Sequence, residues 1–165
     1  MVKIIQLSIV LALISLFTPE SISASEGAEV FDIQKGEVVR SIPNSNALQK
    51  QAKELLASAV GFAGSLRIEP SDGIAIRIPL TPPQKLPNRF VSGTVTEVIL
   101  FVGRIPSYKP TMLVFTKENQ VVAVQLSGGR SLKAFLKAYK LYSPELKLGL
   151  VKMDIQNMDI SQIKR

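Results

Sequence analysis

The side chains that could do chemistry in this chain are cations and carboxylates, because it contains no histidine and no cysteine. Their absence excludes a zinc site of the cysteine–histidine type, a serine–histidine–aspartate triad and a histidine general base. Catalysis would fall to carboxylates, lysine, tyrosine, serine or threonine. No phosphate-loop pattern is present either. We therefore expect no metal, no cofactor, no nucleotide and no nucleic acid as a ligand.

Four cations recur at helical spacing near the end of the chain. Arg130, Lys133, Lys137 and Lys140 are three, four and three residues apart, so on a helix they form one basic stripe. The stripe could bind a phosphate-rich polymer or an anionic membrane surface. The alternative is a solvated helix face whose opposite side covers a sheet. The apolar residues expected on that opposite side are Leu132, Phe135, Leu136 and Tyr139.

Two further cations lie in a proline-rich stretch, residues 79–89. Lys85 and Arg89 could form a recognition surface there together with Phe90, although an ordinary long connection is the alternative. The chain holds 20 lysine and arginine residues against 13 acidic ones, a net charge of +7. A basic protein is attracted to anionic polymers, lipid surfaces and acidic proteins. We therefore predict partner binding at the four-residue stripe and at Lys85 and Arg89.

Glu97 is the one weak candidate for a catalytic residue. It falls in phase with Val95 and Ile99, so it would point into the core with a raised pKa if the strand were regular. Paired with Glu69 or Asp72, it could then serve a hydrolase or lyase. The alternative is a β-bulge that turns Glu97 outward, and the change of pattern after Thr96 favours it.

The elements that must position these residues follow from hydrophobic periodicity. Helical spacing predicts two helices, and alternation bounded by turn residues predicts antiparallel strands. This order predicts an α+β domain, an antiparallel four- to five-stranded meander sheet with two packed helices. The expected elements are a helix over 47–60, a hairpin of 66–69 and 74–78, a loop over 81–89, a strand over 91–102, a hairpin of 111–116 and 121–126, a helix over 130–142 and a last strand over 146–155.

The N-terminus has the pattern of a secretory signal. Lys3 supplies a positive charge, residues 4–17 are almost all apolar, and residues 21–25 are mostly small. The apolar run is shorter than the roughly 20 residues that cross a bilayer, which favours cleavage over an uncleaved membrane anchor. We expect residues 1–24 to be a signal peptide cleaved after Ala24, residues 25–43 to be a mobile arm and linker, and residues 44–165 to form a single domain that is secreted or lies at the cell envelope.

Two resemblances accompany this pattern. Residues 120–124 resemble the Gln-Val-Val-Ala-Gly hairpin of cystatins, but Val124 replaces the glycine and the chain has no tryptophan. Residues 40–44 with the first helix, 76–80 and 92–97 are similar to stretches of small uncharacterised exported proteins of spore-forming Gram-positive bacteria. The second resemblance implies a setting in the cell envelope or outside the cell.

These observations predict an exported, non-enzymatic binding domain with a basic surface for an anionic polymer, a lipid or an acidic protein. A carboxylate-based hydrolase or lyase that uses Glu97 is the alternative, and a secreted protein inhibitor is another. The sequence leaves the oligomeric state open.

Overall fold

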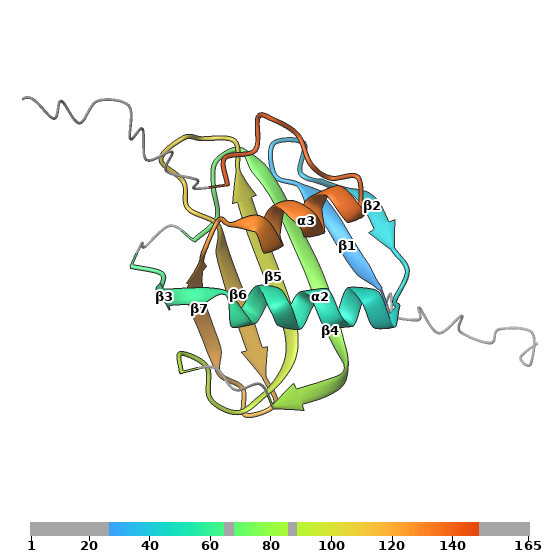
Figure 1. Cartoon of the computed structure of the whole chain (residues 1–165), viewed down its shortest axis with the longest axis vertical. Coiled ribbons are helices and arrows are strands. Elements are labelled where there is room, and N and C mark those ends of the chain that lie inside the picture. Colours follow the sequence, from blue (N-terminus) through green and yellow to red (C-terminus); the bar gives the residue numbers. More distant parts are fainter. Residues whose placement is uncertain (1–26, 65–67, 86–88, 149–165) are drawn as a thin grey trace, which may run out of the picture.

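Seven strands form one antiparallel sheet, and two helices lie across one of its faces (Figure 1). This arrangement comes from a computed structural model, which describes residues 27–64, 68–85 and 89–148. The strands lie in the order β2-β1-β4-β5-β6-β7-β3. The elements are β1 (Ala28–Asp32), β2 (Glu37–Ile42), α2 (Asn46–Ala57), β3 (Ala59–Phe62), β4 (Gly73–Lys85), β5 (Thr94–Gly103), β6 (Thr111–Thr116), β7 (Val121–Leu126) and α3 (Arg130–Ala138).

The α+β class and the antiparallel sheet are confirmed, but the four- to five-stranded meander is wrong. The predicted mobile arm instead forms β1 and β2, and β1 pairs with β4 in the sheet. The polar residues that suggested an arm have distant partners, since Glu29 pairs with Arg77 and Asp32 with Arg104. A local pattern of acidic residues could not reveal partners so far along the chain.

The first helix begins as predicted and ends early. The Ser45 side chain accepts a hydrogen bond from the Leu48 N–H at 3.1 Å, which caps α2. Residues 59 and 60, expected to be helical, belong to β3 instead, because residues 59–62 pair with β7 at the edge of the sheet. The predicted hairpin of 66–69 and 74–78 is also wrong, since β4 pairs with β1 and β5 instead. Residues 65–67 lie outside the described part.

Residues 79–85 of the proline-rich stretch belong to β4 and do not form a separate loop, and residues 86–88 lie outside the described part. Pairing of β4 with β5 is interrupted between Pro79 and Gln84, then resumes where Gln84 lies opposite Val95. Prolines have no N–H to donate to a neighbouring strand, which explains the interruption.

The hairpin predicted over 111–126 is confirmed as β6 and β7. The cystatin-like residues therefore lie inside a strand and not at a hairpin tip.

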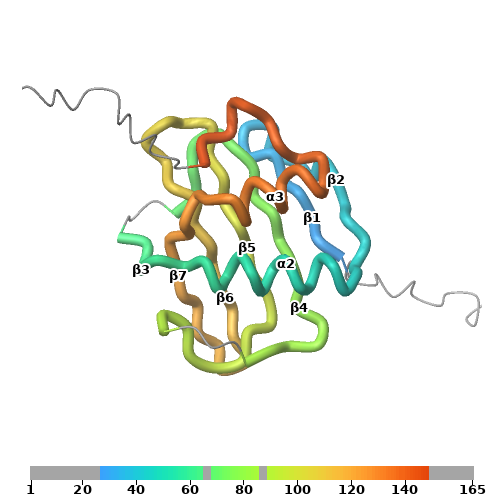
Figure 2. The backbone as a smooth tube through the Cα atoms, in the orientation of Figure 1, coloured from blue at the N-terminus to red at the C-terminus, as the bar shows by residue number. Residues whose placement is uncertain are grey.

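The core lies between the sheet and the two helices, which pack side by side across the strands (Figure 2). Successive residues of a strand point to opposite faces, so one face of each strand is apolar and covered. The largest side chains buried there include Leu48, Leu55, Ile76, Ile78, Leu100, Met112, Phe135 and Leu136. We call α2 and α3 the helix layer, and the opposite side of the sheet, which neither helix covers, the open face.

The second helix is shorter than predicted, since α3 ends at Ala138 and Lys140 adopts a left-handed backbone with φ of 55°. Leu146 and Leu148 are buried against the core without forming a strand. The rest of the strand predicted over 146–155, and the predicted signal peptide of residues 1–24, lie outside the described residues. Neither described helix is long and apolar enough to span a bilayer.

Candidate functional site

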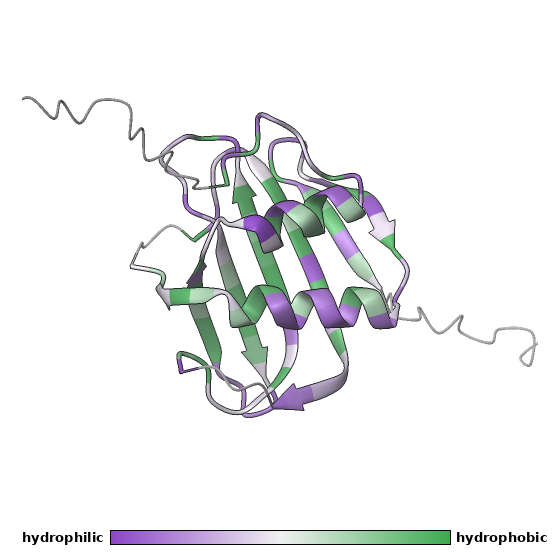
Figure 3. Ribbon diagram, viewed as in Figure 1, coloured by the Kyte–Doolittle hydropathy of each residue, from purple (hydrophilic) through white to green (hydrophobic). Residues whose placement is uncertain are grey.

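Three of the four predicted cations, Arg130, Lys133 and Lys137, form a basic stripe on α3, whereas Lys140 follows the end of the helix with a left-handed backbone. Leu132, Phe135 and Leu136 are buried against the sheet, which fixes the outward direction of the side chains between them. Arg130 and Lys137 are exposed as a result. Figure 3 shows hydrophilic bands on both helices, over strands that are mainly hydrophobic. Helix packing therefore presents the cations to solvent.

Two of these cations share one aromatic ring. The ammonium groups of Lys133 and Lys137 lie 5.3 and 5.5 Å from the centre of the Tyr142 ring. The backbone N–H of Tyr142 donates to the Leu136 carbonyl at 3.1 Å, which holds the tyrosine close to the helix. Attraction between an ammonium group and a ring face keeps both positive charges at one place. Sequence spacing predicted the two lysines but not the ring.

The stripe has no counter-charge within the described part of the chain. None of the ion pairs found there involves Arg130, Lys133, Lys137 or Lys140. The neighbouring helix α2 adds two lysines and one glutamate, while α3 has one arginine, two lysines and no acidic residue. The two helices thus carry a net charge of +4 on one side of the molecule. Such a surplus creates a field that attracts anions.

The other two predicted binding residues lie elsewhere. Lys85 ends β4, and the β4 arrow ends on the side of the sheet away from α3 (Figure 1). The Arg89 guanidinium lies 4.6 Å from the centre of the Phe90 ring, and Phe90 contacts Phe62 edge to face at 5.4 Å. Lys85 and Arg89 are exposed, but the structure does not bring them to the stripe.

Glu97 points away from the core because β5 contains a bulge. Val95 faces Thr116 and Glu97 faces Phe115, so Thr96 is an extra residue in the register. Val95 is fully buried under the helices, and one extra residue turns Glu97 to the open face. The bulge that the sequence favoured as the alternative is therefore present.

The partner of Glu97 is Arg77, which sequence reasoning missed. Arg77 Nη2 lies 2.6 Å from a Glu97 carboxylate oxygen, and Nη1 lies 3.3 Å from Glu29. The hydrogen bond to Glu97 is the main reason that the pKa of Arg77 is raised. Neither predicted partner of Glu97 pairs with Arg77, since Asp72 pairs with Arg104 at 2.5 Å, and Glu69 lines a hollow beside Arg77 without an ion pair to any described residue. No spacing signal joins β1, β4 and β5, so only the sheet order reveals this cluster.

A second cluster joins strand ends and loops around Arg104. Its guanidinium pairs with Asp72 and, at 3.3 Å, with Asp32. The Lys35 N–H, which donates to Asp32, is the main cause that lowers the pKa of this carboxyl, and Arg104 lowers it further. Arg104 pairs with both carboxylates, so the cluster holds the loops in place, and the Arg104 cation is not free to bind a ligand.

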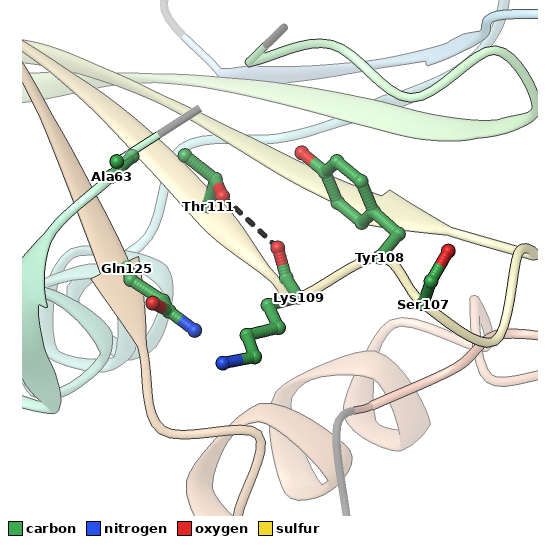
Figure 4. A pocket seen from close by; sticks show the side chains of 7 residues that line it. Ala63, Ser107, Tyr108, Lys109, Thr111 and Gln125 are labelled. Carbon is green, nitrogen blue, oxygen red and sulfur yellow. Dashed lines mark hydrogen bonds between the residues drawn. The ribbon is translucent and has the colours of Figure 1, made fainter. Parts of the chain in front are cut away.

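An open cavity of about 410 Å³ lies beside the loop before β6. In Figure 4 the side chains of Lys109 and Gln125 extend into the same space. The Thr111 hydroxyl donates to the Lys109 carbonyl at 3.0 Å, and the Tyr108 hydroxyl donates to the Ile68 carbonyl. These bonds hold the loop in place.

The described residues contain no group of three or more acidic side chains that could hold a metal ion.

Comparison with known proteins does not identify a family for this chain. No protein-family model, curated protein or solved structure matches the chain.

Proposed function

We propose that this protein is an exported, non-enzymatic binding domain whose helix layer binds an anionic polymer at the cell envelope. The observation that carries the proposal is the pair Lys133 and Lys137 at the Tyr142 ring, neither of which pairs with a carboxylate of the described residues. Cations without a local partner keep their charge available for a ligand, whereas paired cations do not.

A polymer fits the helix layer better than a lipid bilayer does. A helix that binds a membrane surface inserts its apolar side among the acyl chains. The apolar residues of α3 are already buried, with Leu132, Phe135 and Leu136 each at most 1% exposed. Binding is then electrostatic, which suits a chain of repeated phosphates that can follow the cations along the helix.

The alternative function, a hydrolase or lyase that uses Glu97, has less support. Glu97 is held by Arg77 at 2.6 Å on the open face, and its predicted partner Asp72 belongs to the Arg104 cluster. An acid–base pair needs two carboxyl groups on either side of a substrate. Glu97 has Glu29 as its nearest acidic neighbour through Arg77, an arrangement that neutralises charge.

The test is the salt dependence of binding to linear inorganic polyphosphate. The double variant Lys133→Gln/Lys137→Gln should bind more weakly, and its plot of log affinity against log salt should be shallower by about 0.7 for each lost cation, the value for single-stranded polyanions. Lys109→Gln/Lys117→Gln removes the same charge from other exposed positions and is the matched control.

Equal losses in the two double variants would show that net charge alone matters and would sink the proposal. Binding to phosphatidylglycerol vesicles in preference to polyphosphate would assign the helix layer to lipid instead. Preference for polyglutamate over polyphosphate would indicate an acidic protein as the partner.

A further inference from the structure

The open face contains an apolar hollow that lies on the other side of the sheet from the stripe. The hollow has a volume of about 330 Å³, at the small end of the range for ligand sites, which is about 300–1,000 Å³. Its apolar lining comes from four adjacent strands, β2, β1, β4 and β5. These lining residues are Phe31, Val38, Ala75, Ile99 and Phe101.

The described charged residues around the hollow have a net charge opposite to that of the whole chain. Glu29, Glu69 and Arg77 line it, and Arg77 is also paired with Glu97. Three carboxylates against one guanidinium give a net charge of −2 in a chain whose total is +7. Both ends of the guanidinium are already occupied, by Glu29 and by Glu97, so Arg77 is not free to pair with an anion.

We infer that this hollow binds an extended peptide segment that carries one lysine or arginine between aliphatic residues. The aliphatic side chains would lie on the apolar floor, where burial of their surface is favourable. The basic group would reach Glu69, whose carboxylate has no ion-pair partner among the described residues. The partly exposed ring of Phe31 adds a surface that attracts a cation.

The size of the hollow argues for a short segment of a partner. A volume of this order holds a few side chains, which is too little for the interface of a stable dimer. Val38 at the rim is 54% exposed, so the hollow is open to an incoming chain. This inference is independent of the polymer site, because the two lie on opposite faces of the sheet.

The test is a titration of the full chain, followed by amide NMR, with the probe acetyl-Ser-Ile-Lys-Ile-Ser-amide. We expect shifts at the amides of Phe31, Ile99 and Phe101, and weaker binding of the same peptide with glutamate at its centre. Glu69→Gln should weaken the lysine peptide about threefold, the effect of one exposed ion pair. Glu54→Gln on α2 is the matched control and should change nothing.

A second variant keeps the test independent of Glu69. Val38→Lys places a cation at the rim and should weaken the lysine peptide at least tenfold, whereas Val39→Lys, an exposed neighbour outside the hollow, should not. Equal binding of the glutamate peptide, shifts confined to α3, or no shifts at all would overturn the inference. Self-association by sedimentation that Val38→Lys abolishes would assign the face to a second copy and would also overturn it.

Discussion

On the helix layer the cations of α3 form no ion pair with a carboxylate of the described residues, whereas on the open face Arg77 lies between Glu29 and Glu97. The two faces also differ in how far their apolar side chains are exposed. Phe135 is 1% exposed beneath α3, while Phe115 on the open face is only half-buried. The comparison teaches that one face buries its apolar residues for stability and leaves its cations without ion pairs among the described residues. The other pairs most of its charges and leaves apolar surface accessible.

The largest expected difference between the faces is in packing. Phe135→Ala should lower the free energy of unfolding by about 3–5 kcal/mol, because it leaves a cavity in the core. Phe115→Ala should cost about half as much or less, since that ring already contacts water. Urea unfolding of both variants measures this. Equal losses would show that the open face is covered as completely as the other.

The next effect concerns the paired cation of the open face. Arg77→Met leaves Glu29 and Glu97 without a partner in a partly buried position, so we expect a loss of about 1–2 kcal/mol of unfolding free energy. Lys50→Met breaks the exposed pair with Glu54 at 3.9 Å and should change stability by less than about 0.5 kcal/mol. Similar losses in the two variants would mean that the open-face cluster is no more than a surface pair.

Tyr108 is a half-buried phenol at the end of the open face. A side chain at Gly103 would meet the Tyr108 ring at 2.8 Å, so the glycine allows the ring to lie on the sheet. Burial is the main cause that raises the pKa of this phenol to about 12. The unfolded chain loses the proton near pH 10, so stability should fall as pH rises from about 10 towards 12.

The check is urea unfolding on either side of pH 10 in the native chain and in Tyr108→Phe. The variant should lose less stability over this range, because it has no phenol that titrates later in the folded state. An identical pH dependence in both proteins would show that Tyr108 ionises freely and is not held by burial.

The smallest expected effect on stability is on the stripe itself. Lys133→Gln/Lys137→Gln should change the free energy of unfolding by no more than about 0.5 kcal/mol, because both side chains lie at the surface and pair with no carboxylate of the described part. Thermal unfolding measures it. A large loss would mean that the lysines on Tyr142 serve the fold and not a ligand.

Local signals in the sequence predicted the parts of the fold that local physics determines. The buried side of α3 and the β6–β7 hairpin both follow from spacing within a few residues. The bulge at Thr96 was visible as a change of pattern. The basic stripe belongs to the same class, since helical spacing alone aligns its cations.

Pairing between distant segments could not be predicted in this way. The local pattern predicts an arm where β1 and β2 lie, because the partners of Glu29 and Asp32 are far along the chain. Residues 59 and 60 continue a helical pattern, but they belong to β3 because residues 59–62 pair with the edge of β7. The hollow of the open face requires the order of four strands, so no single segment could have indicated it.

The central claim is that the helix layer binds an anionic polymer. The most direct test is an amide NMR titration of the full chain with linear inorganic polyphosphate at low salt. The account predicts shifts at Lys133, Lys137 and Tyr142 that added salt reverses, with the amides of Ile99 and Phe101 unmoved. Shifts centred on Lys85 and Arg89, or on the open face, with α3 unmoved, would contradict it.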